Sequence, residues 1–311
     1  MAAMHTLTTS PILFIVFNRP DVTAKVFDAI RHARPPKLYV AGDGPRANRV
    51  GEEALCKEVR DVVLAVDWPC QVLTKFNDRN LGCREGVVSA LNWFFDCEQE
   101  GIVLEDDCLP APDFFRFCDT LLEYYRQDTR VRHIGGSNFQ RGITRGDASY
   151  YFSRLTHIWG WASWRRVWKE YDKDLTNVSS DDIETALQNY FGDAAIAARW
   201  KRLTTDLQER KIDTWDYQLS IAGFLSNGVA AIPNVNLVTN IGFGEGATHT
   251  HDANHANANL AAGSLSGAIT HPRHFVPNRT ADVFTLNAER KKKSPKDRVK
   301  KWLAWRSEQR E

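Results

Sequence analysis

The feature that most constrains the fold is a series of short apolar runs, separated by helical patterns, in the first third of the chain. Four runs have the length and composition of strands: Ile12–Phe17, Lys37–Val40, Gln71–Phe76 and Gly101–Leu104. Helical spacing of apolar residues follows the first run, where Pro20 suits a first turn, and recurs over Leu81–Phe95. Continuous apolar strands joined by helices are typical of a parallel sheet covered on both faces. We therefore predict an α/β fold.

The composition is that of an ordinary globular protein. The chain has 311 residues, of which 43% are hydrophobic and 25% charged, and this length allows a sizeable core. No apolar run approaches the roughly 20 residues of a transmembrane helix, and residues 1–10 show no secretory signal. The six cysteines include no C-x-x-C pair, so we expect reduced thiols in a cytoplasmic protein.

A basic segment at the C-terminus is concealed by the net charge of +1. Residues 290–311 contain ten Lys or Arg and three Asp or Glu, and Val299, Trp302 and Leu303 would share one helical face. This composition is found in helices on membrane surfaces and in solvated tails, and both interpretations stay open. We expect a main domain over 1–288 and a basic amphipathic tail over 289–311, the candidate for peripheral contact with the inner face of the membrane. The acidic main body argues against a nucleic-acid partner.

Polar side chains follow three of the predicted strands at the point where each ends. They are Asn18 with Arg19, Asp43, and the run Glu105, Asp106 and Asp107. In a parallel sheet the ligand site lies outside the carboxyl ends of the strands, so we expect these groups to converge. Three acids at a buried strand end cost desolvation energy unless a cation compensates them, and Mg²⁺ or Mn²⁺ prefers such oxygens. The run predicts a metal that bridges the protein and a diphosphate, with a solvated acidic turn as the alternative.

The acidic run continues as VLEDDCLPAPDFF over Val103–Phe115, which resembles the aspartate motif of nucleotide-sugar glycosyltransferases with the GT-A fold. The other matching pieces follow in the same order: Asn18-Arg19-Pro20, Gly42-Asp43-Gly44, Trp215-Asp216 and Phe243–His249. The chain is similar to the animal N-acetylglucosaminyltransferases that begin complex N-glycans and to bacterial family-2-like enzymes. The resemblance covers residues 10–255. It implies a Rossmann-like GT-A fold with a mixed, mainly parallel sheet, a nucleotide-sugar-binding half over 10–138 and an acceptor-binding half over 139–288.

The resemblance also assigns roles at the strand ends. Asp107 would ligate Mn²⁺ or Mg²⁺, while Glu105 and Asp106 would hold the ribose and neighbouring groups. Arg19 and Asp43 would contact the base, with Asp43 accepting the imide N–H of uracil. From the residues alone, the alternative for Asp43 between two glycines is to stabilise a turn, and the alternative for Arg19 is to cap the sheet edge.

Further roles fall in the second half of the chain. Asp216 would deprotonate the acceptor hydroxyl, beside Trp215 at the diphosphate, and Asp213 is the competing carboxylate. Because Asp216 lies near a predicted helix start, electrostatic stabilisation of that helix N-terminus is the alternative. The run Gly244–His249 would close over the donor, with His249 near the metal or phosphate. Histidines 249, 251 and 255 alone are a weak zinc signal. In the first half, and apart from the resemblance, the run Asn80–Arg84 opens a predicted helix and would aim either Arg84 or its backbone amides at a phosphate.

Four tryptophans lie close together at positions 159, 161, 164 and 168. Such side chains stack on sugars or, more often, anchor a core or a domain interface. Within this cluster, His157–Trp161 is best suited to face an acceptor, because Gly160 allows a close approach of the backbone.

Together these features predict a metal-dependent inverting glycosyltransferase. It would move a sugar from a UDP-sugar, first of all UDP-GlcNAc, to a hydroxyl of a glycan or lipid-linked glycan. A non-catalytic carbohydrate- or nucleotide-binding protein with the same fold is the main alternative, although Asp107 and Asp216 are both present. A sugar-1-phosphate nucleotidyltransferase would normally carry a Gly-rich basic loop after the first strand, where this chain has Asn18-Arg19-Pro20-Asp21.

Overall fold

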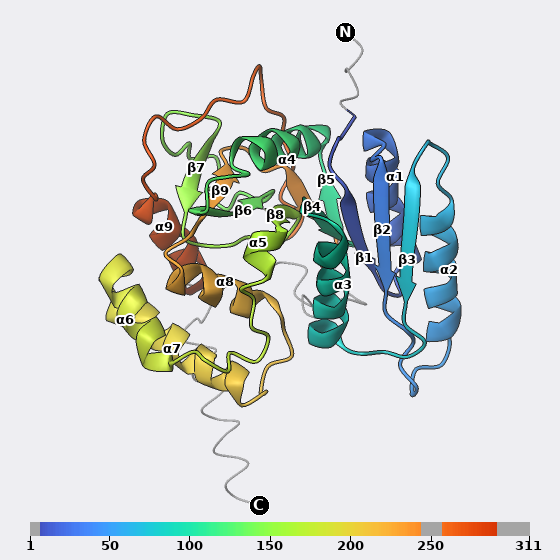
Figure 1. Ribbon diagram of the computed structural model, residues 1–311, viewed down its shortest axis with the longest axis horizontal. Helices are drawn as coiled ribbons and strands as arrows, with labels where there is room; N and C mark the ends of the chain where they lie inside the picture. Colours follow the sequence, from blue (N-terminus) through green and yellow to red (C-terminus); the bar gives the residue numbers. More distant parts are fainter. Residues whose placement is uncertain (1–6, 244–256, 291–311) are drawn as a thin grey trace, which may run out of the picture.

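A mixed eight-stranded sheet with helices on both faces forms the centre of the computed structural model, which describes residues 7–243 and 257–290 (Figure 1). The strands are β1 (Ile12–Val16), β2 (Lys37–Gly42), β3 (Gln71–Phe76), β4 (Glu100–Glu105), β6 (Val131–Gly135), β7 (Tyr150–Ser153), β8 (Trp161–Trp164) and β9 (Val229–Pro233). Their order in the sheet is β3-β2-β1-β4-β8-β6-β9-β7. A separate antiparallel pair joins β5 (Cys108–Pro110) to β10 (Val238–Asn240). The predicted α/β class with a mixed, mainly parallel sheet is confirmed.

The four strands predicted from the sequence form the parallel part of this sheet. β1 lies between β2 and β4, and β3 adds to the outer edge of β2, all in parallel. β8 then reverses the direction, because it is antiparallel to both β4 and β6. The helices α1 (Pro20–Ala33), α2 (Glu52–Leu64) and α3 (Cys83–Cys97) follow the first three strands. The carboxyl ends of β1 to β4 therefore share one edge.

The alternation of side chains along β1 divides the core into two layers. Ile12 and Phe14 belong to a cluster with the buried sides of α1, α2 and α4 (Pro112–Tyr124), whereas Leu13 belongs to a cluster with α3. All three side chains are fully buried, which stabilises the fold by roughly 1.5–3 kcal/mol each. α3 thus covers one face of the parallel strands, and α1 and α2 cover the other.

The second half of the chain adds a group of helices beside the sheet. They are α5 (Arg165–Trp168), α6 (Ser180–Phe191), α7 (Ala194–Gln208), α8 (Asp216–Leu225) and α9 (Arg279–Arg290). α6, α7 and α8 pack around Ile183, Trp200 and Ile221. α9 is joined to β7 and α6 by buried Asp282, which accepts hydrogen bonds from the hydroxyls of Ser153 and Tyr190. The predicted tail begins inside α9, and its residues 291–311 lie outside the described part of the chain.

Three of the four clustered tryptophans are core residues, as the more common interpretation predicts. Trp161, Trp164 and Trp168 are buried, and Trp161 stacks between His133 and Trp215 with ring centroids 5.3 and 5.9 Å away. Trp159 is half-buried. All six cysteines are free thiols.

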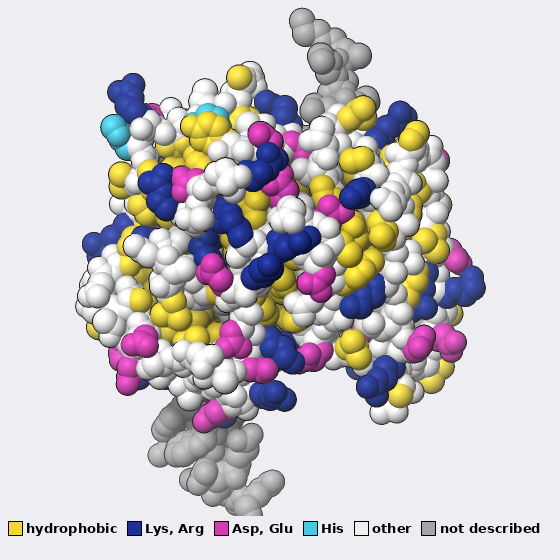
Figure 2. Space-filling model, viewed as in Figure 1, with side chains coloured by type: hydrophobic (Ala, Val, Ile, Leu, Met, Phe, Trp, Pro, Cys, Tyr) yellow, Lys and Arg dark blue, Asp and Glu magenta, His cyan; other side chains and the backbone are white. Residues whose placement is uncertain are grey.

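Within residues 7–243 and 257–290, no helix has the length and apolar character needed to cross a membrane. On the face shown in Figure 2, Lys and Arg side chains are interspersed with Asp and Glu.

The buried His133 makes stability depend on pH. Its Nε2 donates to the backbone carbonyl of His157 at 3.0 Å, and burial lowers the pKa of His133 to about 4. The unfolded chain takes up this proton near pH ~6.5, so the stabilisation is complete above that pH and is lost as the pH falls toward 4.

We predict that His133→Phe flattens the pH dependence of the free energy of unfolding by about 1.4 kcal/mol per pH unit between about pH 4.5 and 6. Urea denaturation at a series of pH values measures this slope. Val276→Ala, which truncates an exposed side chain that does not titrate, is the control and should keep the wild-type slope. An unchanged slope in His133→Phe would contradict the assignment of this pH dependence to His133.

Candidate functional site

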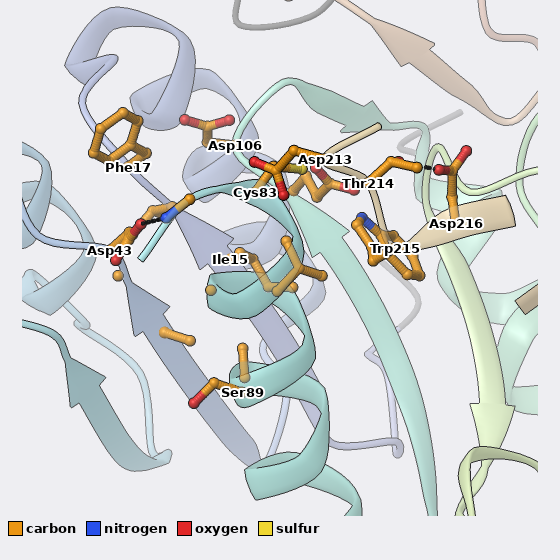
Figure 3. Close-up of a pocket in the computed structure, with 18 of the residues that line it drawn as sticks. Ile15, Phe17, Asp43, Cys83, Ser89, Asp106, Asp213, Thr214, Trp215 and Asp216 are labelled. Carbon is orange, nitrogen blue, oxygen red and sulfur yellow. Dashed lines mark hydrogen bonds between the residues drawn. The ribbon is translucent and has the colours of Figure 1, made fainter. Parts of the chain in front are cut away.

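A cavity of about 720 Å³ opens at the carboxyl edge of the parallel strands and continues between the sheet and α3 (Figure 3). On one side it is lined by Phe17, Arg19 and Asp43, at the ends of β1 and β2, and by Glu105, Asp106 and Asp107, at the end of β4. The helix α3 lines it from Cys83 to Ala90, and Trp159 with residues 212–217 forms a further wall. In Figure 3, Asp43 and Phe17 lie on one side, and Trp215 and Asp216 on the other. Arg19, Asp43 and the acidic run therefore converge at this edge as predicted, whereas Asn18 does not line the cavity and donates to Glu52 at 2.9 Å.

The acids at the end of β4 point in different directions because of the strand register. Glu105 pairs with Ile15 and shares its side of the sheet, the side of α3. Asp106, the next residue, meets the guanidinium of Arg19, which bonds both of its carboxylate oxygens through Nε and Nη2. The same Nη2 donates to Asp107 Oδ2 at 3.1 Å. Arg19 therefore orients two of the three acids, and its predicted contact with a base stays a prediction.

The acidic run carries more negative charge than Arg19 neutralises. Burial, reinforced by the charges of Asp107 and Asp106, raises the pKa of Glu105 to about 8. Burial also raises the pKa of Asp106 to about 6, although Arg19 acts in the opposite direction. Burial opposes the charged form of Arg19, but Asp106 and Asp107 outweigh it and raise the pKa of the guanidinium. A second cation at this edge would relieve the remaining repulsion.

A divalent cation fits this donor set. Carboxylates are hard oxygen ligands, and Mg²⁺ or Mn²⁺ commonly takes one or two of them together with phosphate oxygens. Asp107 lines the cavity with a side chain that is 15% exposed, so its carboxylate is accessible. In the described part of the chain, no three His, Cys, Asp or Glu side chains form a ready metal site. A metal at Asp107 would therefore take further oxygens from a bound substrate.

Asp43 holds the loop between β3 and α3. Its carboxylate accepts hydrogen bonds from the backbone N–H groups of Gly44, Leu81 and Gly82 and from Asn77 Nδ2, at 2.9 to 3.2 Å. This is the turn-stabilising role that its position between two glycines also allowed. The network fixes the carboxylate at the cavity wall, and its contact with uracil stays a prediction.

Arg84 does not line the cavity, contrary to the expectation that it faces a phosphate. Its buried guanidinium pairs with Asp174 and donates to the backbone carbonyl of Lys173 at 2.8 Å. A buried guanidinium needs such partners because it has lost its hydration. Arg84 therefore fastens α3 to the segment before α6.

The two candidate bases, Asp213 and Asp216, both line the cavity but have different partners. Asp213 accepts a hydrogen bond from the backbone N–H of Arg84 at 3.2 Å and so caps the first turn of α3. Asp216 begins α8 and accepts a hydrogen bond from the hydroxyl of Thr214, visible in Figure 3. Trp215 between them is 2% exposed and stacks on Trp161. Asp213 thus has a structural task, which leaves Asp216 as the better candidate for a base.

The predicted closing loop Gly244–His249, with His249, His251 and His255, lies outside the described residues. The described residues before it contact the acidic run, because the Ile241 N–H donates to the carbonyl of Asp107 at 2.9 Å.

Sequence reasoning missed several residues of the cavity. Phe17, Arg46, Lys75, Asn77 and Thr214 line it without belonging to any recognised motif. Lys75 had a usable signal, since it is a charged residue inside a predicted strand, one position before the strand ends. The others depend on how loops fold over the edge, which the local sequence does not reveal.

The chain matches no protein-family model and no curated protein sequence. Similar solved structures include UDP-glucose pyrophosphorylase complexed with UDP-glucose, with 8% identity over 70% of this chain and 97% of that chain, and a TM-score of 0.32. Another is glucosyl-3-phosphoglycerate synthase from Mycobacterium tuberculosis, with 11% identity over 51% of this chain and 57% of that chain, and a TM-score of 0.30. A glycosyltransferase from Streptococcus pneumoniae has 10% identity over 72% and 45%, with a TM-score of 0.34. All three scores are below 0.5, and the fold and site described above rest on this chain's own register and side chains.

Gly242, in the segment after β10, packs closely against Asp107 and Arg19. A Cβ at this position would lie 2.2 Å from Asp107 Oδ2 and 2.7 Å from Arg19 Nη1, so the Arg19–Asp107 contact would have to shift. We predict that Gly242→Ala destabilises the protein by roughly 1–3 kcal/mol in urea denaturation.

The matched control is Gly223→Ala on α8, where an added Cβ meets nothing within 4 Å. This substitution in a helix should stabilise the protein by roughly 0.5–1 kcal/mol. Equal effects of the two substitutions would contradict the close packing at Gly242.

Proposed function

We propose that this protein is a metal-dependent inverting glycosyltransferase that uses a UDP-sugar donor, first of all UDP-GlcNAc. The observation that carries the proposal is the acidic run at the carboxyl edge of the parallel strands, whose negative charge exceeds what Arg19 neutralises. A separate carboxylate, Asp216, lines the same cavity as this run. One acidic group would thus serve a metal and diphosphate, and the other would serve the acceptor.

The chain's own residues would divide the donor-binding work. Asp107 would hold Mn²⁺ or Mg²⁺, which when bound would neutralise charge on the leaving diphosphate. Arg19 would keep Asp107 in place through its 3.1 Å hydrogen bond, and Glu105 and Asp106 would contact the ribose and its neighbours.

Asp216 would act on the acceptor. Its carboxylate would take the proton of the acceptor hydroxyl as the oxygen attacks the anomeric carbon from the side opposite the diphosphate, which inverts that centre. The Thr214 hydroxyl would orient the carboxylate by its hydrogen bond. Trp159 lines the cavity, and its half-buried ring offers an apolar surface for a glycan acceptor. A lipid-linked acceptor and a tail on the membrane belong to the same proposal.

Metal-dependent nucleotide binding tests the donor site. Isothermal titration calorimetry should show that Mn²⁺ tightens UDP binding to the wild type. We predict that Asp107→Asn lowers the affinity for UDP in Mn²⁺ about 10- to 100-fold, because a charge-based contact is worth about 1.5–3 kcal/mol.

The control Asp61→Asn, which removes an exposed carboxylate on α2, should bind UDP as the wild type does. A wild-type protein that binds no nucleotide in Mn²⁺ would sink the transferase proposal.

Asp216→Asn should separate binding from turnover. We predict unchanged UDP affinity but about 10²- to 10⁴-fold slower release of UDP from UDP-GlcNAc, with water or an added glycan as acceptor. Asp213→Asn should instead lower the melting temperature, because it weakens the cap of α3. The reverse pattern would give the base role to Asp213. Formation of UDP-GlcNAc from UTP and GlcNAc-1-phosphate would favour a nucleotidyltransferase.

A further inference from the structure

The cavity has a branch that the proposed transfer step does not use. It lies beneath the carboxyl edge, between the sheet and α3, and one cross-strand row forms its sheet side. In that row Lys75 pairs with Ala41, and Ala41 pairs with Ile15. The side formed by α3 consists of Gly86, Val87, Ser89 and Ala90. In Figure 3, Ser89 lies below Cys83 along α3.

The branch extends along α3 beyond the acids. The α3 residues that line the cavity run from Cys83 to Ala90, which at 1.5 Å per residue corresponds to roughly 10 Å of helix, and the branch takes the part from Gly86 onward. Gly86 lies at its mouth, since a Cβ there would be 3.4 Å from Asp43 Oδ2. Asp43, the residue predicted to contact the base, therefore borders the same branch.

The far part of the branch holds a cation. Lys75 Nζ donates to the backbone carbonyl of Ser89 at 3.0 Å, which places the ammonium against the second turn of α3 rather than at the acids. The side chain is half-buried, and no carboxylate pairs with it in the described ranges 7–243 and 257–290. An ammonium has three N–H donors and no acceptor. Two N–H donors of this cavity-lining side chain thus have no acceptor among the described residues.

We infer that this branch receives the base of the donor nucleotide and that Lys75 selects uracil by donating to its C4 carbonyl oxygen. Uracil has an acceptor at this position, whereas cytosine has an amino group there. An ammonium next to an amino group leaves both donors unsatisfied, and an unpaired buried polar group is costly. Lys75 is therefore a specificity residue for the base. This inference rests on the proposed use of a UDP-sugar.

The test compares UDP and CDP, titrated calorimetrically in Mn²⁺ against the wild type and Lys75→Met. The Met side chain keeps the length and removes the charge. We expect the wild type to bind UDP at least about 10-fold more tightly than CDP, and Lys75→Met to lose about 10- to 100-fold in UDP affinity with little change for CDP. Lys57→Met, an exposed lysine on α2, is the matched control and should keep the wild-type preference.

A second variant distinguishes a loss of base selectivity from a folding defect. Lys75→Gln keeps an N–H donor and adds a carbonyl acceptor, so it should narrow the difference between UDP and CDP while melting as the wild type does. Unchanged affinities in Lys75→Met, or equal losses for UDP and CDP, would overturn the role of Lys75 and leave the transferase proposal standing. Equal affinity of the wild type for UDP and CDP would also overturn the role of Lys75. A wild type that binds neither nucleotide would instead overturn the transferase proposal.

Discussion

The contact on which the site depends is that of Arg19 with the two acids that follow β4. Arg19 holds Asp106 by two hydrogen bonds and Asp107 by one, yet one guanidinium cannot offset three neighbouring acids. Burial, reinforced by this residual charge, raises the pKa of Glu105, and the same charge makes the edge receptive to a further cation. A hard metal with a diphosphate satisfies that requirement, and the function proposed for the cavity follows from it.

The parallel register extends this charge arrangement across the sheet. The row Lys75, Ala41, Ile15 and Glu105 crosses four neighbouring strands on the side of α3. A cation thus stands at one end of the row and an acid at the other, with small or apolar side chains between them. This polarity matches a ligand that carries a neutral carbonyl-bearing ring at one end and negative groups near a metal at the other.

Much of the parallel half could be predicted from the sequence, because each strand there is a continuous apolar run that a helical pattern interrupts. β3 begins and ends as predicted, β1 is one residue shorter, and α1 begins at Pro20. The strands β6 to β9 of the second half escaped prediction, since they are only four or five residues long and lack period-two alternation. Their burial depends on tertiary neighbours rather than on local pattern.

The sequence predicted where the site lies, but not which partners its side chains contact. The convergence of Arg19, Asp43 and the acids follows from strand ends, and it is present. The partners of Arg84 did not follow, because Asp174 is distant in sequence and only the folded chain brings it near. The same holds for Asp43, whose carboxylate is engaged by a loop more than thirty residues away.

The central claim is that the acids after β4 bind a metal together with a nucleotide diphosphate. Crystals of the protein soaked with Mn²⁺ and UDP, with diffraction recorded at the manganese absorption edge, test it most directly. The account predicts one strong anomalous peak within about 2.0–2.3 Å of an Asp107 oxygen, shared with the diphosphate. A nucleotide bound in this cavity without manganese at Asp107, or manganese bound elsewhere, would contradict it.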